Sequence, residues 1–145
     1  MEYHPFKTVL LSLIIIGSHA SQFLTDKTLP EGRLSDACTN ALVSNVSCEY
    51  QVATFLQDRY YPVNSLVEAC TPSCQQGLAV YEDAVLSACN DSDIYRKSET
   101  GYAPAYAIPM QYRYYYNKTC IRDGERWCHD VAHNMATGKI EADRM

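Results

Sequence analysis

Seven cysteines constrain this 145-residue chain more than any other feature of its sequence. A cysteine can ligate a metal, act as a nucleophile or form a disulfide, and the redox compartment of the protein strongly favours one of these roles over the others. The seven positions are Cys38, Cys48, Cys70, Cys74, Cys89, Cys120 and Cys128.

The N-terminus predicts export. Lys7 precedes an apolar run from Val9 to Gly17, which is too short to span a bilayer because a spanning helix needs about 20 apolar residues. Ser18 and Ala20 place small residues at the two positions that a signal peptidase reads. We therefore expect residues 1–20 to be a signal peptide, and the rest of the chain to be secreted, extracellular, free of membrane segments and disulfide-bonded.

Sequons and charge agree with export. Asn45, Asn90 and Asn117 each begin an Asn-X-Ser/Thr sequence, the acceptor pattern for N-linked glycans. The formal net charge is −5, and the chain has no block of basic residues. This distribution argues against nucleic acid and anionic membrane as partners.

The segment from Pro72 to Cys89 is predicted to be a helix fixed at both ends. Thr71 can cap its first turn, and Asn90 tolerates the left-handed conformation that often ends a helix. A helix separates Cys74 from Cys89 by about 22 Å, so each cysteine must bond to a different part of the chain. The predicted buried face, with spacings of three and four residues, consists of Cys74, Leu78, Tyr81, Val85 and Cys89.

Weaker patterns precede this helix. We expect residues 21–37 to form a flexible leader, because they are polar and interrupted by Pro30 and Gly32. Helical spacing predicts a helix over residues 45–59. The pattern Ser65-x-x-Glu68 resembles a capping box and predicts a short helix over residues 65–69.

The C-terminal half looks different. Seven tyrosines lie between residues 95 and 116, and Pro104 and Pro109 favour extended chain there over a long helix. Residues 120–128 are expected to form a compact loop that turns at Asp123 and Gly124. Residues 129–145 are expected to be a polar C-terminal tail with weak helical character as far as Thr137.

Together these patterns predict a mainly α fold: a small disulfide-rich helical domain over residues 38–128, with a tyrosine-rich irregular or extended segment. Seven cysteines leave at least one without a partner in the chain. We expect it to be Cys120 or Cys128, because these two flank a loop near the end of the chain. The sequence leaves the disulfide connectivity open.

No catalytic residue, metal or cofactor is predicted. His129 and His133 are four residues apart, a spacing that lets a helix face hold a metal. Asp130 stands where a zinc protease has glutamate, and a third ligand is not evident, so exposed polar side chains are the expected reading. Cys70 and Cys74 fit disulfides better than a metal site in an exported chain.

Aromatic residues are the candidate ligand-binding residues. Exposed rings can stack on sugars, but tyrosine also packs in small domains and satisfies its hydroxyl there. We expect most of the tyrosines to pack, with residues 112–116 the likeliest to present exposed rings. The candidates are Tyr112, Tyr114, Tyr115, Tyr116 and Trp127.

Several motifs follow one another between residues 38 and 128. They are Asn45-Val46-Ser47-Cys48, Tyr60-Tyr61-Pro62, LVEACTPSC at residues 66–74, Tyr81 before Cys89, Cys120-Ile121-Arg122-Asp123 and Trp127-Cys128. Their order resembles the cysteine-rich region of fungal secreted LysM-domain proteins, where this region accompanies chitin-binding LysM modules. No stretch of the present chain has the pattern of a LysM module itself.

The resemblance implies a secreted, non-enzymatic module associated with chitin or cell-wall glycan binding through a LysM neighbour, or with interaction with a host. It also implies a truncated chain, since related chains continue to a further cysteine pair. Two alternatives stay open. One is a free-standing effector that binds a host protein, and the other is a small metal-dependent hydrolase that uses His129 and His133.

Overall fold

The computed structural model describes residues 20–139. Almost all of the expected signal peptide and the last six residues of the expected tail therefore lie outside the described residues. The helices are α1 (Asp36–Leu42), the 3-10 helix η1 (Tyr50–Gln57), α2 (Val63–Ala69), α3 (Pro72–Ala88), α4 (Ala107–Thr119) and α5 (Cys128–Ala136). The strands are β1 (Ser21–Gln22), β2 (Gly32–Arg33), β3 (Asn45–Val46), β4 (Ile94–Arg96), β5 (Tyr102–Pro104), β6 (Arg122–Asp123) and β7 (Arg126–Trp127).

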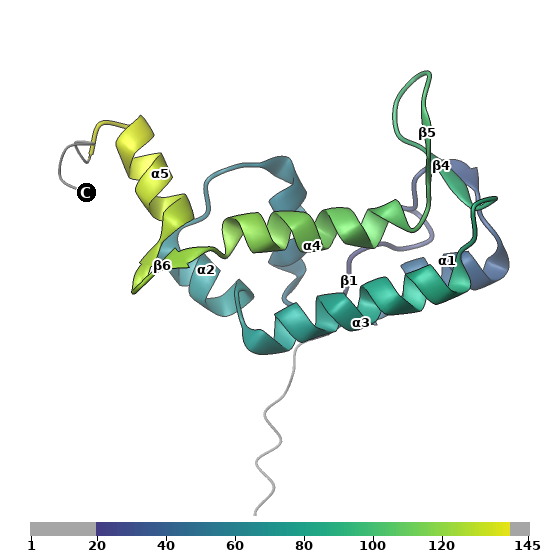
Figure 1. Ribbon diagram of the computed structural model, residues 1–145, viewed down its shortest axis with the longest axis horizontal. Helices are drawn as coiled ribbons and strands as arrows, with labels where there is room; N and C mark the ends of the chain where they lie inside the picture. Colours follow the sequence, from purple (N-terminus) through teal and green to yellow (C-terminus); the bar gives the residue numbers. More distant parts are fainter. Residues whose placement is uncertain (1–19, 140–145) are drawn as a thin grey trace, which may run out of the picture.

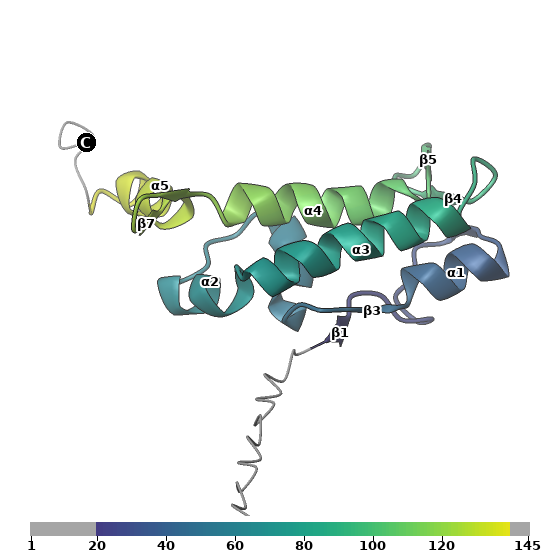
Figure 2. The same ribbon diagram turned by 60° about the horizontal axis from the view of Figure 1, so that its bottom comes forward.

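Two long helices form the centre of the molecule. α3 and α4 run side by side in opposite directions, and η1 packs across α4 (Figures 1 and 2). The antiparallel sheet β2-β4-β5 lies at one end of this pair, and α5 with the β6–β7 hairpin lies at the other. The small pair β1-β3 borders α3. The prediction of a mainly α, disulfide-rich fold is confirmed.

α3 follows its sequence pattern closely. The Thr71 hydroxyl accepts the backbone N–H of Cys74 at 3.2 Å and caps the first turn. Leu78, Tyr81 and Val85 are buried as predicted. The expected left-handed cap at Asn90 is wrong, because the helix ends in extended chain at Cys89, with φ −98° and ψ 146°.

Three disulfides join the helices, and two of them hold the ends of α3. Cys74 bonds to Cys48, which follows β3 in the chain, and Cys89 bonds to Cys38 in α1. The third bond joins Cys70 to Cys120, which ties the start of α3 to the end of α4. Cys128 is the unpaired cysteine, which agrees with the expectation that either Cys120 or Cys128 would be unpaired. The expectation that all seven cysteines could contribute to disulfides is therefore wrong for Cys128.

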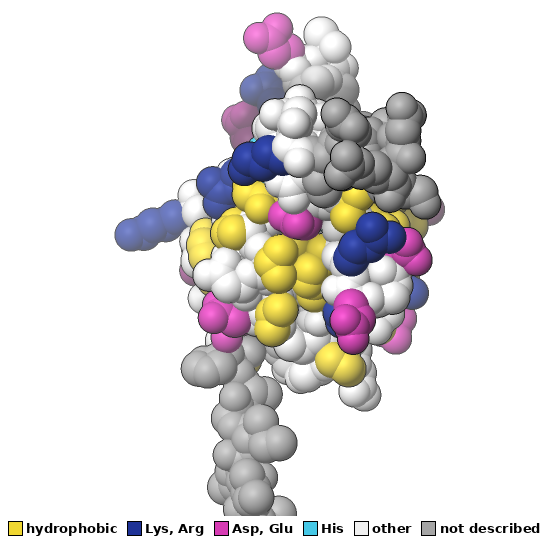
Figure 3. Space-filling view, turned by 90° about the vertical axis from the view of Figure 1, so that its left-hand side faces the viewer, with side chains coloured by type: hydrophobic (Ala, Val, Ile, Leu, Met, Phe, Trp, Pro, Cys, Tyr) yellow, Lys and Arg dark blue, Asp and Glu magenta, His cyan; other side chains and the backbone are white. Residues whose placement is uncertain are grey.

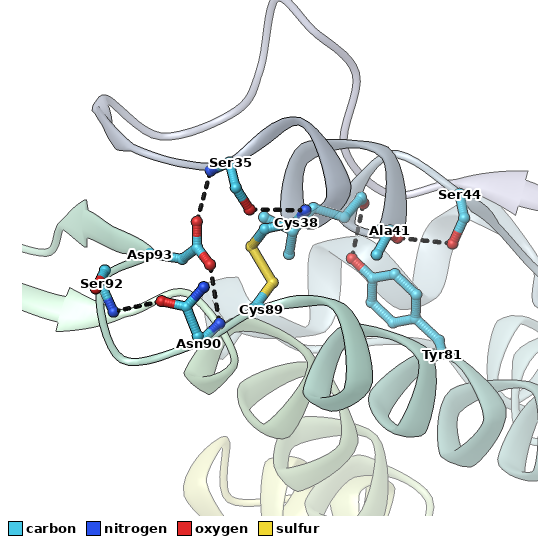
Figure 4. Close-up of a disulfide and its surroundings, with 10 residues drawn as sticks. Ser35, Cys38, Ala41, Ser44, Tyr81, Cys89, Asn90, Ser92 and Asp93 are labelled. Carbon is cyan, nitrogen blue, oxygen red and sulfur yellow. Dashed lines mark hydrogen bonds between the residues drawn. A yellow bond between two sulfur atoms is a disulfide. The ribbon is translucent and has the colours of Figure 1, made fainter.

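A buried carboxylate reinforces the Cys38–Cys89 disulfide (Figure 4). Asp93 is 2% exposed and accepts the backbone N–H of Ser35 at 2.5 Å and that of Asn90 at 2.8 Å. These two bonds join the residue that caps α1 to the residue that follows α3. They hold the pKa of Asp93 below its ordinary value, because both hydrogen bonds favour the ionised carboxylate.

Residues 21–37 belong to the fold and do not form the expected flexible leader. β1 pairs with β3, and β2 pairs with β4. Phe23 and Leu24 are buried, and the Phe23 ring lies 4.9 Å from that of Tyr112. Two neighbouring apolar residues give no periodic pattern, so only their burial against distant helices reveals their role.

The region between residues 45 and 70 also differs from expectation. Residues 45–46 are strand β3, since pairing with β1 and the nearby Cys48 disulfide hold them out of a helix, and the helical part is the shorter 3-10 helix η1. α2 begins at Val63, two residues before the predicted start. Pro62 supplies the extended conformation that precedes a helix, so Ser65 lies inside α2 and not at its cap.

The tyrosine-rich segment contains a helix where extended chain was predicted. Its first part forms strands β4 and β5, in line with the expectation, but residues 107–119 form α4. Pro109 is the third residue of α4, and proline is tolerated there because the first N–H groups of a helix have no intrahelical acceptor.

The C-terminal part agrees partly with expectation. Residues 122–127 form the β6–β7 hairpin, with Gly124 at φ +60° in the predicted turn. α5 accounts for the weak helical signal up to Thr137, which is its C-cap. No helix in the described part of the chain combines the length and apolar character needed to cross a bilayer.

The burial of the α3 face predicts a large loss of stability in Leu78→Ala. Leu78 is 1% exposed, and truncating a fully buried leucine should lower the free energy of unfolding by about 2–5 kcal/mol. Val80→Ala is the matched control on the exposed side of α3, where Val80 is 62% exposed, and it should change that free energy by less than about 0.5 kcal/mol. Urea denaturation of the oxidised proteins measures both, and similar losses would contradict the assigned face.

Asp93 predicts an acid-dependent loss of stability. Its pKa is lowered on folding, so its stabilising effect is complete above the unfolded pKa of about 3.9 and disappears as the pH falls through the lower folded pKa. Asp93→Asn leaves one of the two N–H groups without an acceptor, so this variant should be less stable than the parent at neutral pH. The difference should shrink below about pH 4.

Urea denaturation between neutral and strongly acidic pH measures the effect. Asp83→Asn, on the exposed side of α3, is the control and should track the parent protein throughout. A difference between the parent and Asp93→Asn that persists unchanged into strong acid would rule out the assigned role of the carboxylate.

Candidate functional site

α4 divides the candidate aromatic residues between two faces. Tyr112 and Tyr116 are one helical turn apart and point into the core, with 5% and 4% exposure. Tyr114 is 63% exposed on the outer face, and Tyr115 is half-buried. Trp127, from β7, is buried. Of the five candidates, Tyr114 alone presents most of its surface to solvent.

The inward tyrosines serve packing. The Tyr116 hydroxyl donates to the backbone carbonyl of Thr71 at 2.9 Å, which joins the end of α4 to the cap of α3. Tyr112 contacts Phe23, and burial raises the pKa of its hydroxyl to about 12. Tyr81 behaves similarly on α3, where its hydroxyl donates to the Leu42 carbonyl at 2.8 Å. These rings are not available to a ligand.

The outer face of α4 carries charges beside its rings. The rings of Tyr114 and Tyr115 meet edge to face at 5.2 Å between centroids. The Lys118 ammonium lies 5.8 Å from the Tyr115 centroid and 2.8 Å from a carboxylate oxygen of Asp58. This ion pair lowers the pKa of Asp58 and raises that of Lys118. One turn away, Arg113 pairs with Glu82 of α3 at 3.0 Å.

A hollow of about 390 Å³ brings two of the candidates together. Tyr116 and Trp127 line it, but the Tyr116 hydroxyl is already bonded, and the Arg122 guanidinium lies over the Trp127 ring at 4.7 Å from its centroid. Two further lining residues, Thr71 and Gln75, could not be found from the sequence, because they belong to the cap and first turn of α3, far from α4 in the chain. The hollow has a mixed polar and apolar lining, and its aromatic groups already contact other parts of the fold.

The two histidines are built into the fold. His133 stacks on Tyr60 with 3.7 Å between centroids, and His129 stacks on the same ring at 5.9 Å. The His129 Nε2 atom accepts the backbone N–H of Tyr61 at 3.1 Å. Burial lowers the pKa of His129, partly opposed by a backbone hydrogen bond with Arg59, and the neutral ring suits this acceptor role.

This geometry does not support the hydrolase alternative. The lone pair of His129 that a metal would need is occupied by the N–H of Tyr61. Asp130 accepts the Tyr60 hydroxyl at 2.8 Å and the Asn134 amide at 3.0 Å. Within the described residues, the one group of three potential ligands is Cys38, Cys89 and Asp93, whose two sulfurs form a disulfide.

All three sequon asparagines are exposed, so their side chains are accessible to glycans. Asn45 lies on β3 at the edge of a polar hollow of about 300 Å³, and Asn117 lies near the end of α4. The Asn90 side-chain oxygen accepts the N–H of Ser92 at 2.8 Å (Figure 4). Glycosylation at these positions stays a prediction.

Comparison with known proteins places the chain among fungal secreted proteins. Residues 21–136 match the family described as the secreted LysM effector N-terminal domain. A LysM domain-containing protein of Arthroderma benhamiae is 36% identical over 110 residues, which cover 76% of this chain and 20% of the relative. A second from the same fungus is 31% identical over 123 residues, which cover 82% of this chain and 21% of the relative.

The chain thus spans about a fifth of the length of these relatives. No solved structure gives a significant match. The matched region includes strands β1 and β2 and helix α5, so the family domain is wider at both ends than the cysteine-bearing core of residues 38–128. With a family match that covers most of its length, the chain belongs to the secreted LysM effector N-terminal domain family.

Proposed function

We propose that this chain is a non-catalytic, disulfide-locked scaffold that works beside chitin-binding LysM modules of the same effector polypeptide. Both relatives are named LysM domain-containing proteins, and the chain matches only a fifth of each. The family describes an N-terminal domain of secreted LysM effectors. In this proposal the LysM modules bind the glycan, and this domain provides a rigid support for them.

One observation carries the proposal: the aromatic residues that could have bound sugar are used inside the fold. Tyr112 and Tyr116 hold α4 against its neighbours, and Arg122 covers a face of Trp127. A saccharide needs an exposed ring face to stack on, and Tyr114, whose ring meets the half-buried Tyr115 edge to face, is a small platform.

The disulfides support the same role. Each closes a long loop of the chain, with separations of 51, 26 and 50 residues. Such cross-links restrict the unfolded chain and stabilise a small domain that works outside the cell. Binding of a host protein, the other partner class implied by the resemblance, stays a prediction.

The proposal predicts weak chitin binding by the isolated chain. After incubation with insoluble chitin and washing, most of the secreted 145-residue product should remain in the unbound fraction. The same chain fused to a LysM module should be retained, because the module supplies the binding surface. Immunoblotting of bound and unbound fractions measures the distribution.

Two tyrosine variants make the test specific. Tyr114→Ala removes the exposed candidate ring, and Tyr102→Ala is a matched control on β5, away from the outer face of α4, where Tyr102 is 61% exposed. Neither variant should alter retention of the fused protein. Strong retention of the isolated chain that is lost in Tyr114→Ala but kept in Tyr102→Ala would show that α4 itself binds glycan, and the scaffold proposal would be wrong.

A further inference from the structure

α5 is attached to the rest of the molecule through two neighbouring tyrosines. His133 and His129 stack on the ring of Tyr60, with 3.7 and 5.9 Å between centroids. Asp130 accepts the Tyr60 hydroxyl at 2.8 Å, and the His129 Nε2 atom accepts the backbone N–H of Tyr61 at 3.1 Å. We call these five residues the α5 contact. No residue of α5 is buried, so the α5 contact is an important part of what holds the helix in place.

The hydrogen bond from Tyr61 exists only while His129 is neutral. In this bond Nε2 supplies a lone pair, whereas an imidazolium has none to offer because both of its nitrogens carry protons. Protonation would therefore place a second N–H opposite the N–H of Tyr61. Tyr61 is 2% exposed, so water cannot easily replace the acceptor that its N–H loses.

The groups around His129 influence its charge in both directions. Burial, the largest influence, disfavours the protonated ring, and Lys118 of α4 and His133 of α5 act in the same direction. A backbone hydrogen bond with Arg59 and the Asp58 carboxylate favour the protonated ring. Asp58 is already paired with Lys118 at 2.8 Å, which limits its help. The net result is a pKa of His129 below its ordinary value.

The position of His129 in α5 also disfavours a positive charge. It is the second residue of the helix, where the unpaired N–H groups of the first turn already carry partial positive charge. Its neighbour Asp130 is bonded to the Tyr60 hydroxyl, and the Arg59 guanidinium lies over the Tyr61 ring at 5.3 Å from its centroid. Figure 3 views the molecule from this end, where basic and acidic side chains lie among hydrophobic ones.

We propose that the α5 contact is an acid-sensitive switch, in which protonation of His129 releases α5 from Tyr60 and Tyr61. The attached state requires the neutral ring as an acceptor. In the released state the ring is exposed to water, where an imidazole titrates near pH 6.5. The core stays folded, because its three disulfides and the packing of α3 on α4 include neither histidine.

The direction of the pH effect follows from the two states of α5. The pKa of His129 is lower in the attached state than in the released state, so the released state binds the proton more tightly. Attachment is therefore strongest above about pH 6.5 and is lost as the pH falls through the lower pKa of the attached state. Because one proton is taken up, the ratio of released to attached α5 should rise by up to about tenfold per pH unit.

Trp127 provides the measurement. It is the one tryptophan of the sequence, it is buried, and it directly precedes α5, so its fluorescence reports detachment of the helix. His4 and His19 lie in the expected signal peptide, so the processed protein keeps only the two histidines of α5. Between pH 8 and pH 4.5 the secreted protein should show a reversible, one-proton red shift of its emission, centred at or below about pH 6.5. The NMR signals of the His129 ring and the Tyr61 amide should change with the same midpoint.

Two histidine variants identify the group that titrates. His129→Gln should remove the transition, because the glutamine side-chain oxygen can accept an N–H but does not titrate in this range. His133→Gln is the matched control, since His133 stacks on Tyr60 without accepting the N–H of Tyr61. Its transition should persist and move to slightly higher pH, because His133 lowers the pKa of His129. Near-ultraviolet circular dichroism at pH 7.5 checks that each variant is folded.

A lysine variant tests the electrostatic surroundings. Lys118→Gln removes a positive charge and frees the Asp58 carboxylate, so the transition should move to higher pH. Lys97→Gln, at an exposed lysine directly after β4, is the control and should leave the midpoint unchanged.

The parent protein tests the switch even where a variant folds poorly. An unchanged Trp127 emission between pH 8 and pH 4.5 would overturn the proposal, and so would a Tyr61 amide that titrates without any change in that emission. The same transition in His129→Gln as in the parent would exclude His129 as its origin. Loss of slowly exchanging amides in α3 over this range would show general unfolding instead of a local release.

Discussion

Covalent attachment of both ends of α3 is the constraint on which the rest of the structure depends. The bonds Cys48–Cys74 and Cys38–Cys89 close loops of 26 and 51 residues. In the chain-entropy account, a single loop of either size contributes roughly 3–4 kcal/mol. α1 and β3 are thereby held along α3, and the Asp93 carboxylate completes the junction of α1 with the end of α3.

α4 uses this fixed helix as its support. The Cys70–Cys120 bond ties its last residues to the start of α3, and the Tyr116 hydroxyl bonds to Thr71 beside it. Two ion pairs add to this support, since Arg113 pairs with Glu82 of α3 and Lys118 pairs with Asp58 at the end of η1. The helical part of the tyrosine-rich segment is therefore mainly structural, because Tyr112 and Tyr116 pack in the core and are not presented to a ligand.

The two ends of the molecule differ in how completely they are closed. At one end, the Asp93 carboxylate, the β2-β4-β5 sheet and the Cys38–Cys89 disulfide fix the segments to one another by hydrogen bonds and a covalent bond. At the other end, α5 packs on Tyr60 through its two histidines, and Cys128 has no disulfide partner among the described residues.

The sequence by itself determined the parts of this protein that depend on neighbours in the chain. The period and the Thr71 cap define α3, and the odd number of cysteines indicates one unpaired thiol, which was expected at Cys120 or Cys128 and which the structure assigns to Cys128. The motif order indicated the family. A helix period, a cap, a cysteine count and a motif order can each be read from residues along the chain, so no three-dimensional contact is needed to interpret them.

Only the tertiary structure decided how distant segments meet. Pro109 argues against a helix until it is placed in the first turn of α4, and Phe23 belongs to a polar segment until it packs on Tyr112. The connectivity of the disulfides and the attachment of α5 through His129 are likewise decided across long separations in the chain. Burial, which assigns each tyrosine to the core or to the surface, depends on every element at once, and a local pattern does not contain it.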